Sequence, residues 1–259
     1  MSAALLTLLC ARSSWTPRSL PGVVLWLDAA ALDGTADGAS VAGWADWSGA
    51  GVVSAAVQGS PAARPTYKTQ LTGGGAISPS GRPGVFFAVD DCLRVDGLAP
   101  LLTGTDTPFT VAALFRPSAT GSFGSVLGLG RTLSASDYYA FAGLTDLGRA
   151  FQLRVCGTSK QCAGPDVGVG SPHALIWVQG ETPGYVGRNT LEGSEPGVTA
   201  DLDVAAALFN TCCVGMLDRG GTLFYPLNGY LQSLVVCQGA LGLQDRARLA
   251  AWLRARGGI

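Results

Sequence analysis

The sequence predicts an all-β fold, and three observations support this. The 259 residues include 37 Gly and 14 Pro, and only 14% are charged, a composition typical of many short strands joined by turns. Short apolar segments rich in Val, Leu, Phe and Tyr recur along the chain, with turn residues between them. A helical apolar spacing occurs only near the C-terminus. A chain of this length can form one large domain, so we expect a β-sandwich or barrel followed by one short helix.

The predicted strands follow one another through the chain. In order they are residues 22–27, 84–89, 92–95, 109–116, 125–130, 138–143, 151–156, 173–179, 211–217 and 229–238. Several are apolar on both faces of the pleat, so we expect them in sheet centres, with the second face covered by loops or a partner. Residues 49–80 are rich in Gly, Ser, Ala and Pro, which predicts a long meandering loop.

The first strand, "GVVLWL", runs directly into Asp28. A carboxylate at a strand end is either a catalytic or metal-binding group or a part of the architecture. We favour a cap, because a short carboxylate can accept backbone N–H bonds from the Ala29–Ala31 turn that follows. We expect Trp26 to fill a pocket between the sheets or at their edge.

One helix is predicted over residues 243–258, "LQDRARLAAWLRARGG". Leu249, Trp252 and Leu253 are spaced by three and four, arginines lie near the end, and a Gly pair provides the left-handed cap. We expect this helix to pack on the edge of the sandwich.

The N-terminal residues 1–19 form an apolar segment outside the predicted jelly-roll domain of residues 20–259. This segment lacks the basic start of a secretory signal, and we interpret it as a docking peptide that lies on a neighbouring subunit or on its own sandwich. Its proposed partner-docking residues are Leu5, Leu6, Leu8, Leu9 and Trp15. No apolar run reaches the roughly 20 residues of a membrane span.

Cysteine usage and net charge indicate the redox compartment and the kind of partner. The chain has seven cysteines, an odd number, which favours buried thiols in a reducing compartment. Cys156 and Cys162 are the one pair that could face each other across a hairpin and form a disulfide. The formal net charge of −1 provides no basic surface for nucleic acid.

Catalytic and metal-binding patterns are weak. His173 is the only histidine, and a lone histidine is more often satisfied structurally than catalytic. The three Glu residues, at 181, 192 and 195, fall in a loop-like region and offer no strand-borne acid pair for sugar hydrolysis. Asp90 and Asp91 could bind calcium, but we favour a turn. We therefore expect no enzyme and no metal or cofactor, with calcium as the open alternative.

A ligand-binding platform is predicted from aromatic residues near loops. Trp44 is assigned to the core, whereas Trp47 follows Asp46 beside a Ser-Gly turn and could stack on the apolar face of a sugar. The predicted ligand-binding residues are Asp46, Trp47, Tyr138 and Tyr139.

The segment from Trp15 to Gly258 resembles a known group of domains. "WTPRSLPGVVLWLDAAALDG…GWADWSGAG", "RPGVFFAVDDCLRV", "FTVAALFRP" and the closing "LNGYLQSLVVCQ" strand with its helix are similar, in this order, to laminin G-like, concanavalin A-like domains of tailed-phage structural proteins and bacterial surface proteins. The resemblance implies a two-sheet antiparallel jelly-roll sandwich. The family's Asn-containing loop is replaced here by Ser48–Val52, which removes amides that could bind a ligand.

Two function hypotheses follow. The first is a virion structural or decoration protein on a phage head or tail surface, anchored by residues 1–19 to other virion proteins or to copies of itself. The alternative is a carbohydrate-binding or adhesion module at the bacterial cell surface, with a host surface glycan as its ligand. A glycan hydrolase would need acid and base residues that the sequence does not provide.

Overall fold

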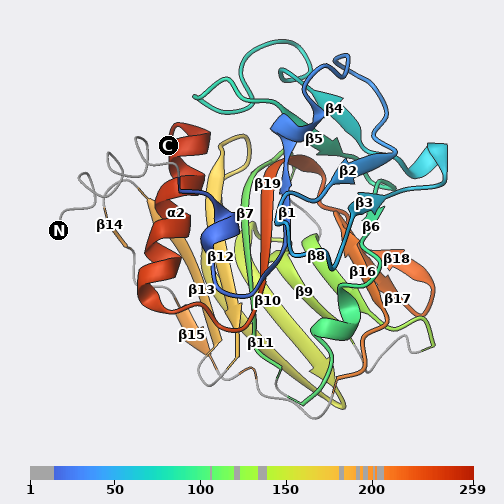
Figure 1. Cartoon of the computed structure of the whole chain (residues 1–259), viewed down its shortest axis with the longest axis vertical. Helices are drawn as coiled ribbons and strands as arrows, with labels where there is room; N and C mark the ends of the chain where they lie inside the picture. Colours follow the sequence, from blue (N-terminus) through green and yellow to red (C-terminus); the bar gives the residue numbers. More distant parts are fainter. Residues whose placement is uncertain are drawn as a thin grey trace.

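The computed structural model describes residues 15–105, 107–119, 123–133, 139–180, 184–190, 193–194, 198–200, 202 and 207–259. Two antiparallel sheets pack face to face, and an α-helix lies outside the first of them (Figure 1). This confirms the predicted all-β sandwich with a C-terminal helix.

The first sheet has the order β14-β13-β12-β7-β19-β5-β4 in the described residues, with β1 paired to β19 and β15 to β13. Its strands are β1 (Val23–Asp28), β4 (Thr66–Lys68), β5 (Gly84–Phe87), β7 (Phe109–Pro117), β12 (His173–Gln179), β13 (Gly184–Thr190), β14 (Gly193–Ser194), β15 (Val198–Ala200) and β19 (Gly229–Gln238).

The second sheet has the order β11-β10-β9-β8-β16-β6-β3-β2 in the same residues. Its strands are β2 (Gly43–Ala45), β3 (Ala55–Val57), β6 (Leu93–Arg94), β8 (Gly124–Gly130), β9 (Tyr139–Leu144), β10 (Arg149–Cys156), β11 (Thr158–Asp166) and β16 (Thr211–Val214). A separate hairpin joins β17 (Leu217–Arg219) to β18 (Thr222–Phe224). Short 3-10 helices are η1 (Pro17–Ser19), η2 (Ala29–Leu32), η3 (Pro61–Ala63) and η4 (Ala99–Leu101).

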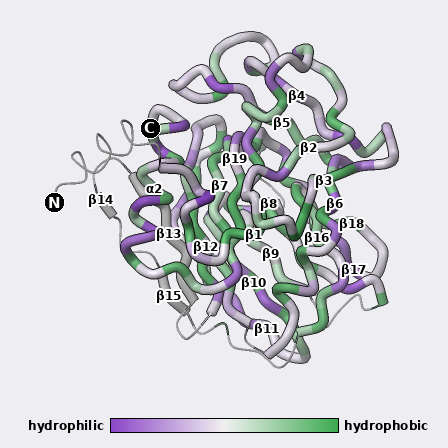
Figure 2. The backbone as a smooth tube through the Cα atoms, in the orientation of Figure 1, coloured by the Kyte–Doolittle hydropathy of each residue, from purple (hydrophilic) through white to green (hydrophobic). Residues whose placement is uncertain are grey.

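The alternation of side chains along β7 defines two apolar layers. Val111, Ala113 and Phe115 lie in the core between the sheets, while Ala112 and Leu114 belong to a second cluster on the outer face of the first sheet. Hydrophobic residues accordingly concentrate on the central strands (Figure 2). Strands that are apolar on both faces need a cover on each side, as the sequence predicted.

The cover on the outer face is helix α2 (Leu243–Gly257), which packs over β12 and β7. The prediction that this helix lies on the sandwich edge was wrong, because the apolar outer face of these central strands provides more surface to bury than an edge does. Its own side chains Leu249 and Leu253 are fully buried. The helix ends at Gly258 in the left-handed conformation, with φ of 70°, as expected for a C-cap glycine.

Asp28 has the capping role that the sequence predicted. Its Oδ1 accepts a hydrogen bond from the Ala30 N–H at 3.0 Å, at the start of η2. Its Oδ2 also accepts from Arg256 of α2, whose Nε lies 3.1 Å away. Trp26 lies on the outer face under α2 and meets Trp252 edge to face at 5.6 Å, so its expected place between the sheets was wrong. The alternative, a place at the edge, fits better, because β1 pairs only with β19 in the described residues.

Three local predictions need correction. Residues 49–80 are not one loop, since they contain β3, η3 and β4. The segment 211–217 is split by Gly215, which has φ of 85° and turns the chain from β16 into β17. Cys156 and Cys162 do not face each other: the β10–β11 hairpin turns tightly at Gly157, which puts Cys156 opposite Thr158 and Cys162 opposite Gln152. The cysteines in the described residues are all buried, as expected.

Candidate functional site

The β17–β18 hairpin folds back over the outer face of the second sheet. Leu127 and Leu129 of β8 point into the core, so the glycines between and after them, Gly128 and Gly130, point outward. A Cβ on Gly128 would lie 2.5 Å from the carbonyl oxygen of Met216, and one on Gly130 would overlap the Asp218 carbonyl. The hairpin backbone can therefore lie directly on β8 because these positions are glycine.

The hairpin adjoins a mainly aromatic cluster on this outer face, in which Phe151 and Leu217 are buried and the other side chains are partly exposed. We call it the aromatic face: Phe123, Tyr139, Phe151, Leu153, Leu217, Phe224 and Tyr225. Within it the Phe123 ring centroid lies 5.7 Å from that of Phe151 and 5.5 Å from that of Tyr225. Phe224, at the rim, is 37% exposed. The aromatic face thus presents ring surface on the side of the sandwich that α2 does not cover.

Arg219 lies at the centre of the aromatic face. Its Cζ lies 4.6 Å from the Tyr139 ring centroid and 4.9 Å from that of Phe224, distances typical of cation–π contacts. Its Nη1 donates a hydrogen bond to the Tyr225 hydroxyl at 3.2 Å. Burial raises the pKa of the Tyr139 hydroxyl, and the charge of Arg219 acts in the opposite direction. A neutral phenol and a guanidinium here offer donors next to aromatic rings.

Polar residues continue the same surface across neighbouring strands. In the ladder Val155 lies opposite Tyr139 on one side and opposite Ser159 on the other, and Leu153 lies opposite Gln161. Directly opposed residues share a face of a sheet. Ser159 and Gln161 are exposed, so hydroxyl and amide groups line the β11 side of the aromatic face.

Of the predicted ligand-binding residues, the structure places Tyr139 in the aromatic face. Asp46 is elsewhere, and its carboxylate accepts hydrogen bonds from the backbone N–H of Trp26 at 2.8 Å and of Ser48 at 2.9 Å. Trp47 packs edge to face on Trp26, in the cluster under α2. Asp46 and Trp47 therefore do not join Tyr139 in one platform, and Tyr138 lies outside the described residues.

The docking residues are described only in part. Trp15 packs against the cluster under α2, on its own sandwich. The other predicted docking residues, Leu5, Leu6, Leu8 and Leu9, lie outside the described residues, so the docking peptide stays a prediction.

Sequence reasoning missed Arg219, Phe224 and Tyr225. They belong to the stretch "DRGGTLFYP", in which a Gly pair separates two short segments, a hairpin signal that could have been used. Their proximity to Tyr139 depends on the fold and carries no local signal.

Other candidate groups have structural roles. The His173 Nε2 lies 2.8 Å from the Gly168 carbonyl oxygen, and the Asp91 carboxylate accepts from the Ala88 N–H at 2.8 Å, which confirms the turn interpretation. Burial raises the pKa of Asp91. Among the described residues no cluster of three or more His, Cys, Asp or Glu side chains could hold a metal ion. Within the same ranges, none of the helices has the length and apolar character to cross a membrane.

Solved structures share this fold. Domain 4 of AbnA, a GH43 extracellular arabinanase from Geobacillus stearothermophilus solved with arabinotriose, has a TM-score of 0.57 and 12% identity over 88% of this chain and 98% of that one. The CBM40 of the Ruminococcus gnavus IT-sialidase, solved with α2,3 sialyllactose, has a TM-score of 0.52 and 14% identity over 64% of this chain and 95% of that one.

The NanB sialidase of Streptococcus pneumoniae has a TM-score of 0.53 and 15% identity over 63% of this chain, which spans only 27% of that protein. The sequence matches no family model and no curated protein. At these identities the likeness concerns the fold alone. It supports the lectin-like jelly roll that the resemblance implied, whereas the laminin G and phage context stays a prediction.

Proposed function

We propose that this chain is a non-catalytic carbohydrate-binding module and that its aromatic face is the glycan-binding surface. The observation that carries the proposal is the arrangement of Arg219 between the rings of Tyr139 and Phe224, beside a row of exposed polar side chains. Aromatic rings suit the C–H faces of sugars, and nearby hydroxyl, amide and guanidinium groups suit their hydroxyls.

Two further points support the proposal. The aromatic face lies on the outer side of the second sheet, where it is not buried by α2. Two proteins of the same fold were solved with bound sugars, arabinotriose in one and α2,3 sialyllactose in the other. These likenesses concern the fold, so the sugar that this chain would bind is left to experiment.

In the proposed complex a sugar ring stacks on the exposed ring surface of Phe224 and Tyr139. Its hydroxyls accept hydrogen bonds from Arg219, and they donate to or accept from the side chains of Gln161 and Ser159. A shallow surface of this kind gives weak contacts, which several copies on one particle or cell would strengthen by avidity.

The test is a glycan array with the full chain, with and without calcium, followed by titration of the best glycan into two variants. Phe224→Ala removes a partly exposed ring, and we expect about threefold to tenfold weaker binding from the lost stacking. Gln161→Ala removes an exposed amide, and we expect a weakening of similar size from a lost hydrogen bond. Leu243→Ala is the matched control, because Leu243 is 77% exposed but lies on α2, on the opposite side of the sandwich.

The proposal is rejected if no glycan binds in either calcium condition, or if both face variants bind as well as Leu243→Ala. We place the module at a bacterial cell surface as part of the same proposal. The virion hypothesis depends on the docking peptide of residues 1–19, of which residues 1–14 lie outside the described residues, so it stays a prediction.

A further inference from the structure

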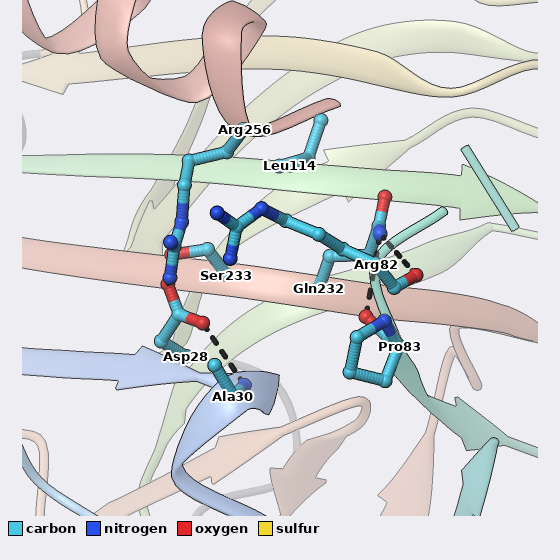
Figure 3. A pocket seen from close by; sticks show the side chains of 8 residues that line it. All are labelled: Asp28, Ala30, Arg82, Pro83, Leu114, Gln232, Ser233 and Arg256. Carbon is cyan, nitrogen blue, oxygen red and sulfur yellow. Dashed lines mark hydrogen bonds and ion pairs between the residues drawn. The ribbon is translucent and has the colours of Figure 1, made fainter. Parts of the chain in front are cut away.

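A small pocket opens at the end of α2, away from the aromatic face. It lies among β1, β7, β19, the last turn of α2 and the loop before β5 (Figure 3). Its lining residues are Asp28, Ala30, Arg82, Pro83, Leu114, Gln232, Ser233 and Arg256. The space is about 10 Å³, enough for one water-sized group.

A β-bulge shapes one wall of this pocket. In the pairing of β19 with β7, Leu231 lies opposite Phe115 and Ser233 opposite Leu114, so Gln232 is the extra residue. Its Nε2 donates to the Ser78 hydroxyl and the Arg82 carbonyl, both at 3.0 Å, and to the Pro83 carbonyl at 3.3 Å. These acceptors fix the orientation of the amide and hold the loop that carries Arg82.

The same amide leaves an acceptor without a partner. Gln232 is 3% exposed, and its Oε1 is buried with no hydrogen-bond partner in the described structure. A buried oxygen of this kind is costly unless a donor reaches it. The wall therefore provides an acceptor that suits a hydroxyl on a ligand.

Arg82 supplies the charge. Figure 3 shows its side chain reaching across the pocket toward Arg256 and Asp28. Arg256 is paired with Asp28, whereas the Arg82 guanidinium makes no hydrogen bond or ion pair with the residues that the structure describes. Burial, and then the charge of Arg256, lower the pKa of Arg82, but a guanidinium stays protonated at neutral pH. Asp28 and Asp33 are the carboxylates that act on Arg82, so they balance the charges of the two guanidiniums, and what Arg82 offers a ligand is its N–H donors.

We propose that this pocket is an oxyanion-binding subsite, in which the Arg82 guanidinium holds one carboxylate or sulfate group. The enclosed space takes one water-sized atom, so a single oxygen of such a group enters it and accepts from the guanidinium, while the rest of the ligand lies outside. A sugar acid adds hydroxyl groups beside its carboxylate, whereas a free inorganic anion has only the charge.

The test is isothermal titration of the full chain with sodium glucuronate, sodium sulfate and glucose at constant ionic strength. Glucose is the neutral match of glucuronate. The variant Arg82→Gln removes the charge and keeps the length of the side chain, and we expect at least about tenfold weaker anion binding from the lost charged hydrogen bonds. The control Arg149→Gln makes the same change in net charge at an exposed residue of the second sheet.

Each outcome decides the matter. Arg82-dependent binding of glucuronate supports the subsite and identifies a sugar acid as its source, and Arg82-dependent binding of sulfate alone supports it with an inorganic anion. The proposal is overturned if neither anion binds, if Arg82→Gln weakens glucose binding as much as glucuronate binding, or if Arg149→Gln weakens anion binding as much as Arg82→Gln. Arg82→Gln should leave the binding of the best neutral glycan unchanged, because Arg82 is not part of the aromatic face, so this proposal and the glycan-binding one can fail separately. Equal thermal midpoints of Arg82→Gln and the parent chain exclude misfolding as the cause.

Discussion

Replacement of Gly130 by Ala tests whether the hairpin is fixed to the second sheet by close backbone packing. The new methyl group would overlap the carbonyl oxygen of Asp218, and a backbone atom of the hairpin cannot move aside as a flexible side chain could. The hairpin must therefore shift away from β8. Overpacking of this kind costs about 1 to 3 kcal/mol.

The shift also affects the ion pair between Arg94 and Asp218. Arg94 Nη1 lies 3.0 Å from Asp218 Oδ2, and the Asp218 side chain is only 1% exposed. The Arg94 side chain is 43% exposed, so this half-buried hydrogen bond contributes at the lower end of about 1.5 to 3 kcal/mol, part of which would be lost. We therefore expect Gly130→Ala to lower the free energy of unfolding by about 2 to 4 kcal/mol.

The assay is urea unfolding of the full chain, followed by fluorescence. Gly43→Ala is the matched control, because Gly43 lies on β2 of the same sheet and a Cβ there would have its nearest neighbour at 3.9 Å. We expect the control to be neutral or slightly stabilising, by up to about 1 kcal/mol, since Ala restricts the unfolded chain. Equal unfolding midpoints for Gly130→Ala and Gly43→Ala would refute the packing argument.

Two further predictions concern the helix side and the buried thiols. Arg256→Gln should destabilise the fold by about 3 kcal/mol in urea unfolding, because it leaves the buried Asp28 carboxylate without its ion pair. Arg248→Gln, in an exposed pair, should cost less than about 0.5 kcal/mol. Equal effects of the two substitutions would contradict this. Burial raises the pKa of Cys213 and of Cys237 to about 12 from the ordinary value of 9.0. The thiols of the unfolded chain therefore ionise first as the pH rises. The free energy of unfolding should fall above pH 9, by up to about 1.4 kcal/mol per pH unit for each thiol. Cys237→Ala should remove its share of that slope, measured by urea unfolding between pH 8 and about pH 10, and an unchanged slope would argue against burial as the cause.

The sequence predicted the parts of the fold that depend on local pattern. The strands around Phe115 and Leu234 have enough apolar residues to be recognised without their partners, and the spacing of Leu249, Trp252 and Leu253 identifies the helix. The placement of that helix was not predictable in this way. It depends on which sheet face is left uncovered, and several strands far apart in the sequence determine that face together.

Strand β11 illustrates why other elements were missed. Its sequence, "TSKQCAGPD", is polar and contains Gly and Pro, which argue against a strand. It is extended because it pairs with β10, and Cys162 alone among its residues joins the core. The candidate site likewise depends on contacts between distant segments. Tyr139 could be selected from the sequence as an aromatic residue near a loop, but Arg219 becomes relevant only because the β17–β18 hairpin places it next to Tyr139.

The cluster beneath α2 has a practical consequence for orientation. Trp15, the first described residue, and Ile259, the last residue, both pack against it. Both ends of the described chain therefore emerge behind the first sheet, while the aromatic face points away from them on the other side of the sandwich. A tag, linker or surface attached at the C-terminus would leave that face directed outward. A chain immobilised on a sensor through its C-terminus would thus keep the proposed glycan surface open to solution.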